Sequence, residues 1–404
     1  MKKYDEYKDS GVAWIGDVPK HWEVIPFKRA MTINNGSDYK HIQVDVSGYP
    51  VIGSGGEFAR ASQYVYDGEV VLLGRKGTID KPMYYNGKFW TVDTMFYAIP
   101  KKYINCKYLY YQALNIPFER YATATALPSM TQTDLNMNVI CLPPTIEQTA
   151  IATYLDTHCA KIDNLISIQQ KRIALLQELK QSVITHAVTK GLSPNVEMKP
   201  SGVEWIGDVP KHWKILRGKY VLNILSGFPF DSQKFEFEDN GVYMPLIRIR
   251  DINCSSTEVY YSGSYPIESV VKTGEVLIGM DGDFNISKWK GTNALLNQRV
   301  CKLREDSSMN THYAFYMLSS PLKAINSVTY ATTVKHLSVY DIYNVFIPVP
   351  PIPEQATIAS YLDHKCATID ASISNAQHQI ELLQEYKQSL ITEVVTGKRK
   401  VTEN

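Results

Sequence analysis

The segment SGVAWIGDVPKHW at residues 10–22 occurs again as SGVEWIGDVPKHW at residues 201–213, and the copies differ only at Ala13 and Glu204. A second pair follows in the same order, with PPTIEQTAIATYLD at residues 143–156 and PPIPEQATIASYLD at residues 350–363. Self-similarity at a long, fixed period indicates a duplicated structural unit. We therefore expect two copies of one frame, each enclosing its own insert.

The two inserts differ in length and in most of their residues. The first motif recurs after 191 positions (201 against 10) and the second after 207 (350 against 143), so the second insert is longer by the difference of 16 residues. Only GEVVLLGRKG at 68–77 faintly echoes GEVLIGMDG at 274–282. A shared scaffold with divergent inserts suits two readers of different targets. The alternative is a tandem duplication without such a division of labour.

Composition indicates a globular chain without general affinity for polyanions. Of the 404 residues 44% are apolar, and 42 Lys and Arg stand against 41 Asp and Glu, so any DNA-binding surface must be a local patch. The six cysteines form no Cys-x-x-Cys pair, which argues against a zinc site or a disulfide framework. The chain has no signal core and no apolar run long enough to span a bilayer, so we expect a cytoplasmic protein.

Each proline pair leads into a predicted long helix. Thr145 suits an N-cap with Gln148 three residues later, and Pro353 falls at a first helical position, where its missing N–H is tolerated. Apolar residues then recur at three- and four-residue steps, as in a coiled coil, up to Gly191 and Gly397. About 45 helical residues would make a rod on the order of 65 Å. The seam residues are Ile151, Leu155, Cys159, Ile162, Ile166, Ile173, Leu176 and Val183, then Ile358, Leu362, Cys366, Ile369, Ile373, Ala376, Ile380, Leu383, Leu390 and Val394, with polar breaks at Gln169, Lys180 and Lys387.

The simplest burial places one stripe against the other. Residues 192–352 leave the end of the first helix and must reach the start of the second, which favours antiparallel pairing with one insert at each end. Parallel dimerisation with another chain is the alternative. An approximate two-fold axis would present the inserts equivalently to the two antiparallel DNA strands, at parts of a target about 34 Å apart.

These motifs resemble the specificity subunits of type I restriction-modification systems. The resemblance covers essentially the whole chain and includes the repeated frame motif, the PPxxEQ motif and four further pieces in the family's order. These pieces are GYPVIGSGG at 48–56, GRKG at 74–77, PLIRIR at 245–250 and LIGMDGDF at 277–284.

With the helical pattern, the resemblance predicts an α+β fold in which two mixed α/β target-recognition domains are joined by two long antiparallel helices in a coiled coil, with an internal pseudo-two-fold repeat. The expected domains are residues 1–145 and 192–352 for target recognition, 146–191 for the central spacer helix, and 353–404 for the C-terminal spacer helix and tail. The variable parts would lie near 23–142 and 214–349 and read a split, asymmetric DNA sequence.

The resemblance also implies which partners carry the chemistry. Double-stranded DNA and two methyltransferase subunits would bind this chain, and motor-nuclease subunits would join through the methyltransferases. S-adenosylmethionine, ATP and Mg²⁺ would belong to those subunits, with no cofactor in this chain and no membrane partner. The sequence itself contains no Asn-Pro-Pro-Tyr or Asp-Pro-Pro-Tyr motif, no phosphate-binding Gly-x-x-x-x-Gly-Lys-Ser/Thr loop and no metal-ligand spacing among nine histidines, so we expect a non-catalytic subunit.

Candidate DNA contacts are polar residues in the turn-rich parts of the inserts, because such side chains read base edges and phosphates. The candidates are Arg60, Gln63, Arg75, Lys76, Lys81 and Ser129 in the first insert, and Arg248, Arg250, Asn285, Lys288, Lys290, Lys335 and His336 in the second. Glycines flank Arg75 and Lys76 and permit close approach, although a solvated hairpin turn is the alternative. Arg248 and Arg250 are expected on one face of a strand over 246–252, with ion pairing as the alternative.

Other polar and aromatic residues are expected to be structural. Arg299 lies among apolar neighbours, and Trp14, Trp22, Trp205 and Trp213 belong to the repeated frame. Two other classes of protein remain open: a coiled-coil adaptor that binds only proteins, and a nuclease or methyltransferase with unrecognised motifs. DNA protection would exclude the adaptor, and methyl transfer by the isolated chain would identify the enzyme.

Overall fold

The first insert folds into a seven-stranded mixed sheet with the order β4-β10-β8-β9-β6-β7-β5. The computed structural model describes residues 3–121, 128–328 and 335–401. Neighbouring strands are antiparallel except for β6 and β9, which run parallel. The strands are β4 (Met31–Asn35), β5 (Gln43–Val44), β6 (Tyr49–Gly53), β7 (Gly56–Ala61), β8 (Tyr66–Gly74), β9 (Met83–Thr91) and β10 (Met95–Pro100).

Short helices and strand pairs complete this half. Helix α2 packs against β8, β9 and β10, and its Leu109 shares a core with Val71, Leu73 and Phe96. The first frame motif contributes β2, which pairs with β1, while β3 pairs with β11 just before the long helix. These elements are β1 (Tyr7–Asp9), β2 (Asp17–Pro19), β3 (Glu23–Pro26), α1 (Phe27–Ala30), η1 (Lys40–Ile42), α2 (Cys106–Ala113), η2 (Phe118–Tyr121), α3 (Gln132–Met137) and β11 (Val139–Leu142).

The second insert repeats four strands of the first insert's sheet, but its remaining strands form a second, separate sheet. The order β15-β23-β20-β21 corresponds to β4-β10-β8-β9 of the first insert, and β16-β18-β17-β22-β19 forms a separate sheet. The strands are β15 (Asn223–Ser226), β16 (Phe235–Glu236), β17 (Met244–Ile247), β18 (Tyr260–Tyr261), β19 (Val270–Val271), β20 (Val276–Gly279), β21 (Ile286–Lys288), β22 (Ala294–Leu296) and β23 (Val300–Arg304).

The division of the second sheet occurs at Trp289. Its ring is buried and its Nε1 donates to the carbonyl of Thr292, which makes a turn where the first insert has one continuous nine-residue strand, β9. Gly291 lies under the indole, because a Cβ there would fall 2.4 Å from the Trp289 ring. The remaining elements are β12 (Met198–Pro200), β13 (Asp208–Pro210), β14 (Lys214–Arg217), η3 (Gly218–Tyr220), η4 (Ser232–Lys234), η5 (Ile249–Asp251), η6 (Ile267–Ser269), α5 (Thr311–Val328), α6 (Val339–Asn344) and β24 (Phe346–Val349).

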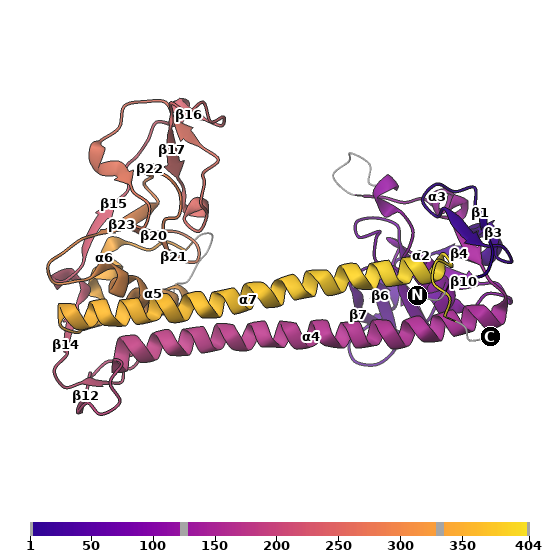
Figure 1. The fold of residues 1–404 in the computed structure, drawn as a ribbon, viewed down its shortest axis with the longest axis horizontal. Coiled ribbons are helices and arrows are strands. Elements are labelled where there is room, and N and C mark those ends of the chain that lie inside the picture. The colour runs from indigo at the N-terminus through magenta and orange to yellow at the C-terminus, as the bar shows by residue number, and fades with distance from the viewer. Residues whose placement is uncertain (1–2, 122–127, 329–334, 402–404) are drawn as a thin grey trace. The chain divides into compact units, whose positions relative to one another are not determined.

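The two predicted long helices are α4 (Thr145–Lys190) and α7 (Ile352–Val395), drawn in Figure 1. Each ends as predicted near a glycine in the left-handed region, Gly191 with φ 74° and Gly397 with φ 73°. Glycine adopts this conformation without the steric cost that a Cβ imposes, and so it stops a helix. Among the described residues, no helix carries an apolar stretch of the length and hydropathy needed to cross a bilayer.

Contacts divide the chain into unit 1, residues Met1–Lys171 with Gln377–Asn404, and unit 2, Arg172–Ala376. In unit 1, Leu155 and Cys159 of α4 share a core with Leu390 of α7. In unit 2, Val188 of α4 shares a core with Leu362 of α7. Early residues of α4 thus meet late residues of α7, and late residues meet early ones. The predicted antiparallel pairing and the α+β class are confirmed.

Candidate nucleic-acid interface

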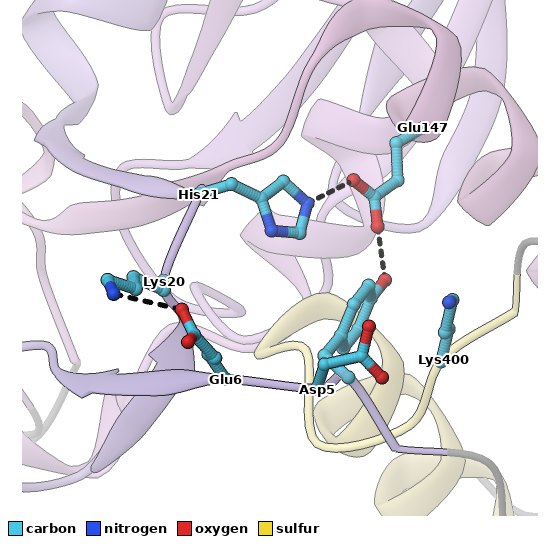
Figure 2. A pocket seen from close by; sticks show the side chains of 7 residues that line it. Asp5, Glu6, Lys20, His21, Glu147 and Lys400 are labelled. Atoms are coloured by element: carbon cyan, nitrogen blue, oxygen red, sulfur yellow. Dashed lines mark hydrogen bonds and ion pairs between the residues drawn. The ribbon is translucent and has the colours of Figure 1, made fainter.

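Where α4 begins, Glu147 binds Tyr4 and two side chains of the first frame motif, His21 and Trp22. Figure 2 shows the contact between Glu147 and His21. Tyr4 donates its hydroxyl hydrogen to Glu147 Oε1, Trp22 Nε1 donates to Oε2 at 3.2 Å, and His21 Nε2 lies 3.0 Å from Oε2. Burial, followed by the bond to Glu147, raises the pKa of Tyr4, so the phenol keeps its proton. A cavity of about 560 Å³ lies beside this cluster, lined by Tyr4, Asp5, Glu6, Lys20, His21, Glu147 and Lys400.

This cluster fastens the frame motif to the helix. Trp22 is fully buried, as its predicted packing role requires. In the second copy, His212 Nε2 lies 2.8 Å from Glu354, whereas the buried Nε1 of Trp213 has no hydrogen-bond partner within the described residues. No group of three or more His, Cys, Asp or Glu side chains in the described ranges is placed to hold a metal ion.

A second fastening joins the first insert to α4. Tyr111 on α2 donates its hydroxyl hydrogen to Asp156 Oδ1 at 2.8 Å, and Lys107 on the same helix forms an ion pair with the Asp156 carboxylate. Burial and the bond to Asp156 raise the pKa of Tyr111. The insert is thereby held to its stretch of helix by a neutral phenol and a lysine.

Unit 2 repeats this fastening with a lysine from a different element. Tyr316 on α5 and Lys288 on β21 both donate to Asp363 Oδ1 at 2.6 Å. Burial acts to raise the pKa of Asp363, but hydrogen bonds from Lys288 and Tyr316 outweigh it and lower the pKa. The Lys288 ammonium also lies 5.2 Å from the ring centroid of Phe315. Lys288, a predicted DNA contact, is therefore engaged inside the protein.

Three segments of unit 1 meet beyond the end of β8 and form what we name loop site 1: residues 74–77, 92–95 and 128–130. The Arg75 N–H donates to the Thr94 carbonyl at 2.8 Å, and the Met130 N–H donates to the Arg75 carbonyl at 2.9 Å. Lys76 and Ser129 face each other in an antiparallel bridge. Thr131 then caps α3 in a capping box, which fixes the third segment. Three predicted contacts, Arg75, Lys76 and Ser129, are thus brought together.

The side chains of loop site 1 carry positive charge and a hydroxyl. Lys76 and Ser129 are exposed. Arg75 is half-buried, with Nη1 donating to the Asp93 carbonyl at 3.3 Å and its guanidinium 5.8 Å from the Phe96 ring centroid. The Arg75 guanidinium keeps further N–H donors beyond this bond. Such a set suits phosphate oxygens and the acceptor-rich edge of guanine.

Unit 2 builds the same backbone frame from residues 279–282, 297–300 and 335–337, which we name loop site 2. The Met280 N–H donates to the Arg299 carbonyl at 3.0 Å, and the Leu337 N–H donates to the Met280 carbonyl at 2.7 Å. Asp281 and His336 face each other in the antiparallel bridge that Lys76 and Ser129 make in unit 1. The Ser338 capping box of α6 again fixes the third segment.

Apart from the glycines at both ends of the first segment, the side chains of loop site 2 differ from those of loop site 1. Asp281 stands where unit 1 has Lys76, and His336 stands where it has Ser129. His336 Nδ1 lies 2.7 Å from Asp281 Oδ1, and Arg299 Nε lies 3.6 Å from Oδ2. Two copies of one backbone therefore present a basic set in unit 1 and a carboxylate between an imidazole and a guanidinium in unit 2.

The other predicted contacts of the first insert lie outside the three segments that form loop site 1. Arg60 on β7 pairs with Glu57 at 2.8 Å and donates to the Gly48 carbonyl at 3.0 Å. Gln63 and Lys81 are exposed on the segments before β8 and β9. Within the described residues, none of the three forms a hydrogen bond or ion pair with loop site 1.

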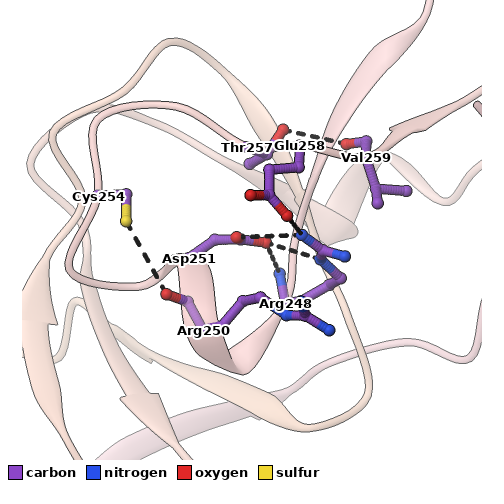
Figure 3. A network of polar contacts seen from close by, with 7 residues as sticks. All are labelled: Arg248, Arg250, Asp251, Cys254, Thr257, Glu258 and Val259. Carbon is purple, nitrogen blue, oxygen red and sulfur yellow. Dashed lines mark hydrogen bonds and ion pairs between the residues drawn. The ribbon is translucent and has the colours of Figure 1, made fainter. Parts of the chain in front are cut away.

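The expected strand over 246–252 is wrong beyond Ile247, because β17 ends there and the 3₁₀ turn η5 follows from Ile249. Figure 3 shows the polar contacts between Arg248 and Asp251 at this turn. The Asp251 carboxylate accepts from both the N–H and the Nε of Arg248 at 3.0 Å, and Glu258 accepts from its Nη2 at 2.9 Å. The Arg248 side chain is 18% exposed, and the bond to Asp251 raises its pKa despite burial. Arg250 lies exposed on the turn, so the two arginines do not share a strand face.

The remaining candidates of the second insert lie at the two ends of β21 and in loop site 2. Asn285 and Lys290 are exposed at either end of β21. Lys335 lies within the loop site, but its Nζ donates to the Asn326 carbonyl at 2.6 Å at the end of α5. The structure thus brings Lys335 and His336 together with Asp281 and Arg299.

Sequence reasoning did not select Thr94 or Asp281, and it expected Arg299 to be structural. The faint echo of residues 68–77 in 274–282 aligns Gly74 with Gly279 and Gly77 with Gly282, and this signal could have paired Lys76 with Asp281. No such signal pairs Thr94 with Arg299, because their equivalence lies in the backbone bonds that they receive.

Comparisons with known proteins agree with this arrangement. The profile of a family described as "Type I restriction modification DNA specificity domain" matches residues 19–177 and 210–382. The specificity subunit of the type I restriction enzyme EcoBI from Escherichia coli is 35% identical over 207 residues, which cover 51% of this chain and 43% of that subunit. The match therefore spans less than half the length of that relative.

Two further similarities extend along more of the chain. The specificity subunit of the type I restriction enzyme MjaVIII from Methanocaldococcus jannaschii is 26% identical over 351 residues, covering 82% of this chain and 76% of that one. A solved chain from work on complex assembly and conformational transition of the type I R-M system has a TM-score of 0.71 at 16% identity, covering 94% of this chain and 98% of that chain. At this identity the likeness shows the fold alone.

Proposed function

Since this chain belongs to the type I restriction-modification DNA specificity family, as a non-catalytic specificity subunit, we propose that it reads a split, asymmetric sequence in double-stranded DNA. Residues 1–145 and 192–352 act as the two target-recognition domains. Residues 146–191 and 353–404 act as the spacer that fixes the gap between the parts of the target. The thirteen predicted contact residues form the proposed DNA-binding set, and Asp281, Arg299 and Thr94 join it.

The observation that carries this proposal is the pair of loop sites. Their backbones make equivalent bridges and equivalent hydrogen bonds, whereas their side chains offer different donors and acceptors. Sequence is read by donors and acceptors presented to base edges from a fixed backbone. Two such frames with unlike side chains therefore suit two unlike parts of one target.

The proposed contacts fall into two groups by what surrounds them. Arg75, Ser129 and His336 stand in the loop sites and suit base edges, while exposed lysines such as Lys76 and Lys290 suit phosphates. Arg248 and Lys288 are already ion-paired, so DNA contact by either would have to share or replace a carboxylate partner.

Two methyltransferase subunits are the proposed protein partners, and each unit offers an apolar surface for one of them. In unit 2, Leu175 and Leu179 of α4 are at least half exposed, four residues apart on one face of the helix. In unit 1, Leu382 and Tyr386 of α7 repeat this pattern at the same offset of 207 residues that separates the helix motifs (382 against 175). Large exposed apolar groups of this kind commonly mark protein interfaces.

The remaining chemistry is assigned to those partners. Motor-nuclease subunits would join through the methyltransferases, and S-adenosylmethionine, ATP and Mg²⁺ would be bound by the partner subunits in the cytoplasm. The role of this chain is then to choose the sequence and to hold the methyltransferases beside it.

Mapping of methylated adenines tests the proposal. The chain is assembled with its methyltransferase subunits, incubated with genomic DNA and S-adenosylmethionine, and the modified sites are sequenced. We expect one motif with two defined parts separated by a gap of constant length, and no motif when this chain is omitted. A contiguous motif, or methylation that needs no specificity chain, would contradict the proposal. Methyl transfer by this chain alone would contradict its non-catalytic role.

A further inference from the structure

Asp281 and His336 make a side-chain hydrogen bond in loop site 2, in addition to the backbone bridge that Lys76 and Ser129 also make in loop site 1. The pair is fixed by its backbone, because the two residues bridge, the Gly282 N–H donates to the Lys335 carbonyl at 3.0 Å, and the Leu337 N–H donates to the Met280 carbonyl at 2.7 Å. The His336 side chain is 54% exposed and that of Asp281 is 23% exposed. The imidazole therefore faces outward while its partner lies behind it.

The contact between the two side chains selects one tautomer of the imidazole. A carboxylate only accepts hydrogen bonds, so the hydrogen between His336 Nδ1 and Asp281 Oδ1, 2.7 Å apart, must come from Nδ1. In the neutral ring, Nε2 then carries the lone pair and is an acceptor. Within the described residues, Nε2 has no hydrogen-bond partner, so this acceptor is free for a ligand.

The surrounding residues stiffen this arrangement. Arg299 Nε lies 3.6 Å from the other oxygen of Asp281, which leaves the carboxylate engaged on both sides. Phe284, which is buried, holds a φ of 50° in the β20–β21 loop, and such strained positions of residues other than glycine concentrate at functional sites. Asn326 accepts from Lys335 and donates to the Gly282 carbonyl, which ties the two segments of the pair to α5.

We propose that His336 Nε2 reads a base with an exocyclic amino group, adenine or cytosine, in the part of the target that unit 2 contacts. In the major groove adenine N6 and cytosine N4 are donors, whereas guanine and thymine present acceptors at the corresponding edge. Asp281 acts as the positioning residue that keeps the Nε2 lone pair outward. Ser129, at the equivalent place in loop site 1, has a hydroxyl that both donates and accepts, and so it imposes no such choice.

This inference rests on the proposed function, and methylation mapping with the assembled methyltransferase complex tests both separately. His336→Phe removes the acceptor and keeps a planar ring. We expect it to reduce discrimination roughly tenfold at one base position of the unit 2 part, the scale of a lost base contact. The unit 1 part should not change. Lys211→Ala, which removes the exposed Lys211 and Glu197 ion pair, is the control and should leave both parts unchanged.

Asp281→Asn provides the second, sharper variant. The amide can donate to Nδ1, which permits the tautomer with a hydrogen on Nε2. Guanine or thymine should therefore be accepted at the position that His336→Phe relaxes. This variant keeps the size of the side chain, and the unit 1 part of the motif reports that the protein is folded.

The possible results separate the two claims. A wild-type motif without two parts would overturn the proposed function itself. A wild-type motif with two parts that both variants leave unchanged would overturn only the role of His336. Relaxation at a position that the wild type reads as guanine or thymine would overturn the assignment of Nε2 as an acceptor. The expected result is that His336→Phe reduces discrimination at an adenine or cytosine, and that Asp281→Asn accepts guanine or thymine at the same position.

Discussion

Lys180 of α4 donates hydrogen bonds to both carboxylate oxygens of Asp370 on α7, each at 2.7 Å. Lys387 of α7 makes the same pair of bonds to Asp163 on α4, also at 2.7 Å. Each unit thus pairs a late residue of one helix with an early residue of the other. The polar breaks at Lys180 and Lys387 in the predicted seams are the sites of these repeated ion pairs, so they fix the register between the helices.

Reversal of this charge tests the register. Lys180→Glu places two carboxylates together, and we expect it to lower the free energy of unfolding by about 1 kcal/mol, because both side chains are partly exposed and solvent screens the repulsion. The double variant Lys180→Glu with Asp370→Lys should recover most of the loss. Urea unfolding at low and high salt measures both. Equal losses in the single and double variants would show that the pair does not hold the helices together.

Two leucines of α4 distinguish the buried seam between the helices from the exposed apolar surface proposed to bind a methyltransferase subunit, which we call the docking surface. Leu155 is fully buried, and Leu155→Ala should lower the free energy of unfolding by about 2–5 kcal/mol through the cavity it leaves. Leu175 is 65% exposed, and Leu175→Ala should change stability by less than about 0.5 kcal/mol while weakening the binding of a methyltransferase subunit. Chemical unfolding and a binding titration distinguish them. Normal methyltransferase binding by the Leu175 variant would remove that residue from the docking surface.

The helices could be predicted closely because their signals are local. Proline before the first turn and glycine after the last fix the ends, and the three- and four-residue steps fix the buried face. The antiparallel pairing followed from connectivity alone. The sheets could be predicted only as mixed α/β inserts. The alternation of residues around Trp289 does not show that the second insert has two strands, β21 and β22, where the first insert has the single strand β9.

The loop sites were predicted in part, for a related reason. Lys76 and Ser129, or Asp281 and His336, lie more than fifty residues apart and meet only when the sheet and the short capped helix are formed. The PLIRIR segment was misassigned because its alternation is typical of a strand. The Asp251 carboxylate accepts hydrogen bonds from the backbone N–H and the guanidinium of Arg248, and these bonds replace strand pairing at Arg248.

Buried thiols predict how stability depends on pH. Burial raises the pKa values of Cys106, Cys141 and Cys301 to about 12, above about 8.5 for a free thiol. Between these values the folded chain holds protons that the unfolded chain has lost. Stability is therefore full below about pH 8.5 and falls as pH rises, by about 1.4 kcal/mol per pH unit for each thiol. Urea midpoints between pH 8 and 11 should fall less steeply for Cys301→Ala, and an unchanged slope would contradict the protonated thiol.

Lys288 and Lys290 are neighbours on one segment with different surroundings. Lys290 is exposed, and Lys290→Ala should reduce the slope of log Kobs against log salt by about 0.9, the loss of one phosphate contact. Lys288 is held by Asp363, so Lys288→Ala should lower the stability of unit 2 and reduce the salt slope by less than Lys290→Ala does. DNA-binding titrations over a range of salt, together with thermal unfolding, measure both. Equal salt slopes for the two variants would contradict the distinction between Lys288, which is paired with Asp363, and Lys290, which is expected to contact a phosphate.

Exchange of one insert tests most directly whether each unit reads its own part of the target. Residues 214–349 begin at β14 and end at β24, which pair with each other, so an insert from another member of the family can replace them at a closed boundary. With the methyltransferase subunits present, the methylated motif of the exchanged chain should keep the unit 1 part and acquire a new unit 2 part. An unchanged motif, or a change in both parts, would contradict the account.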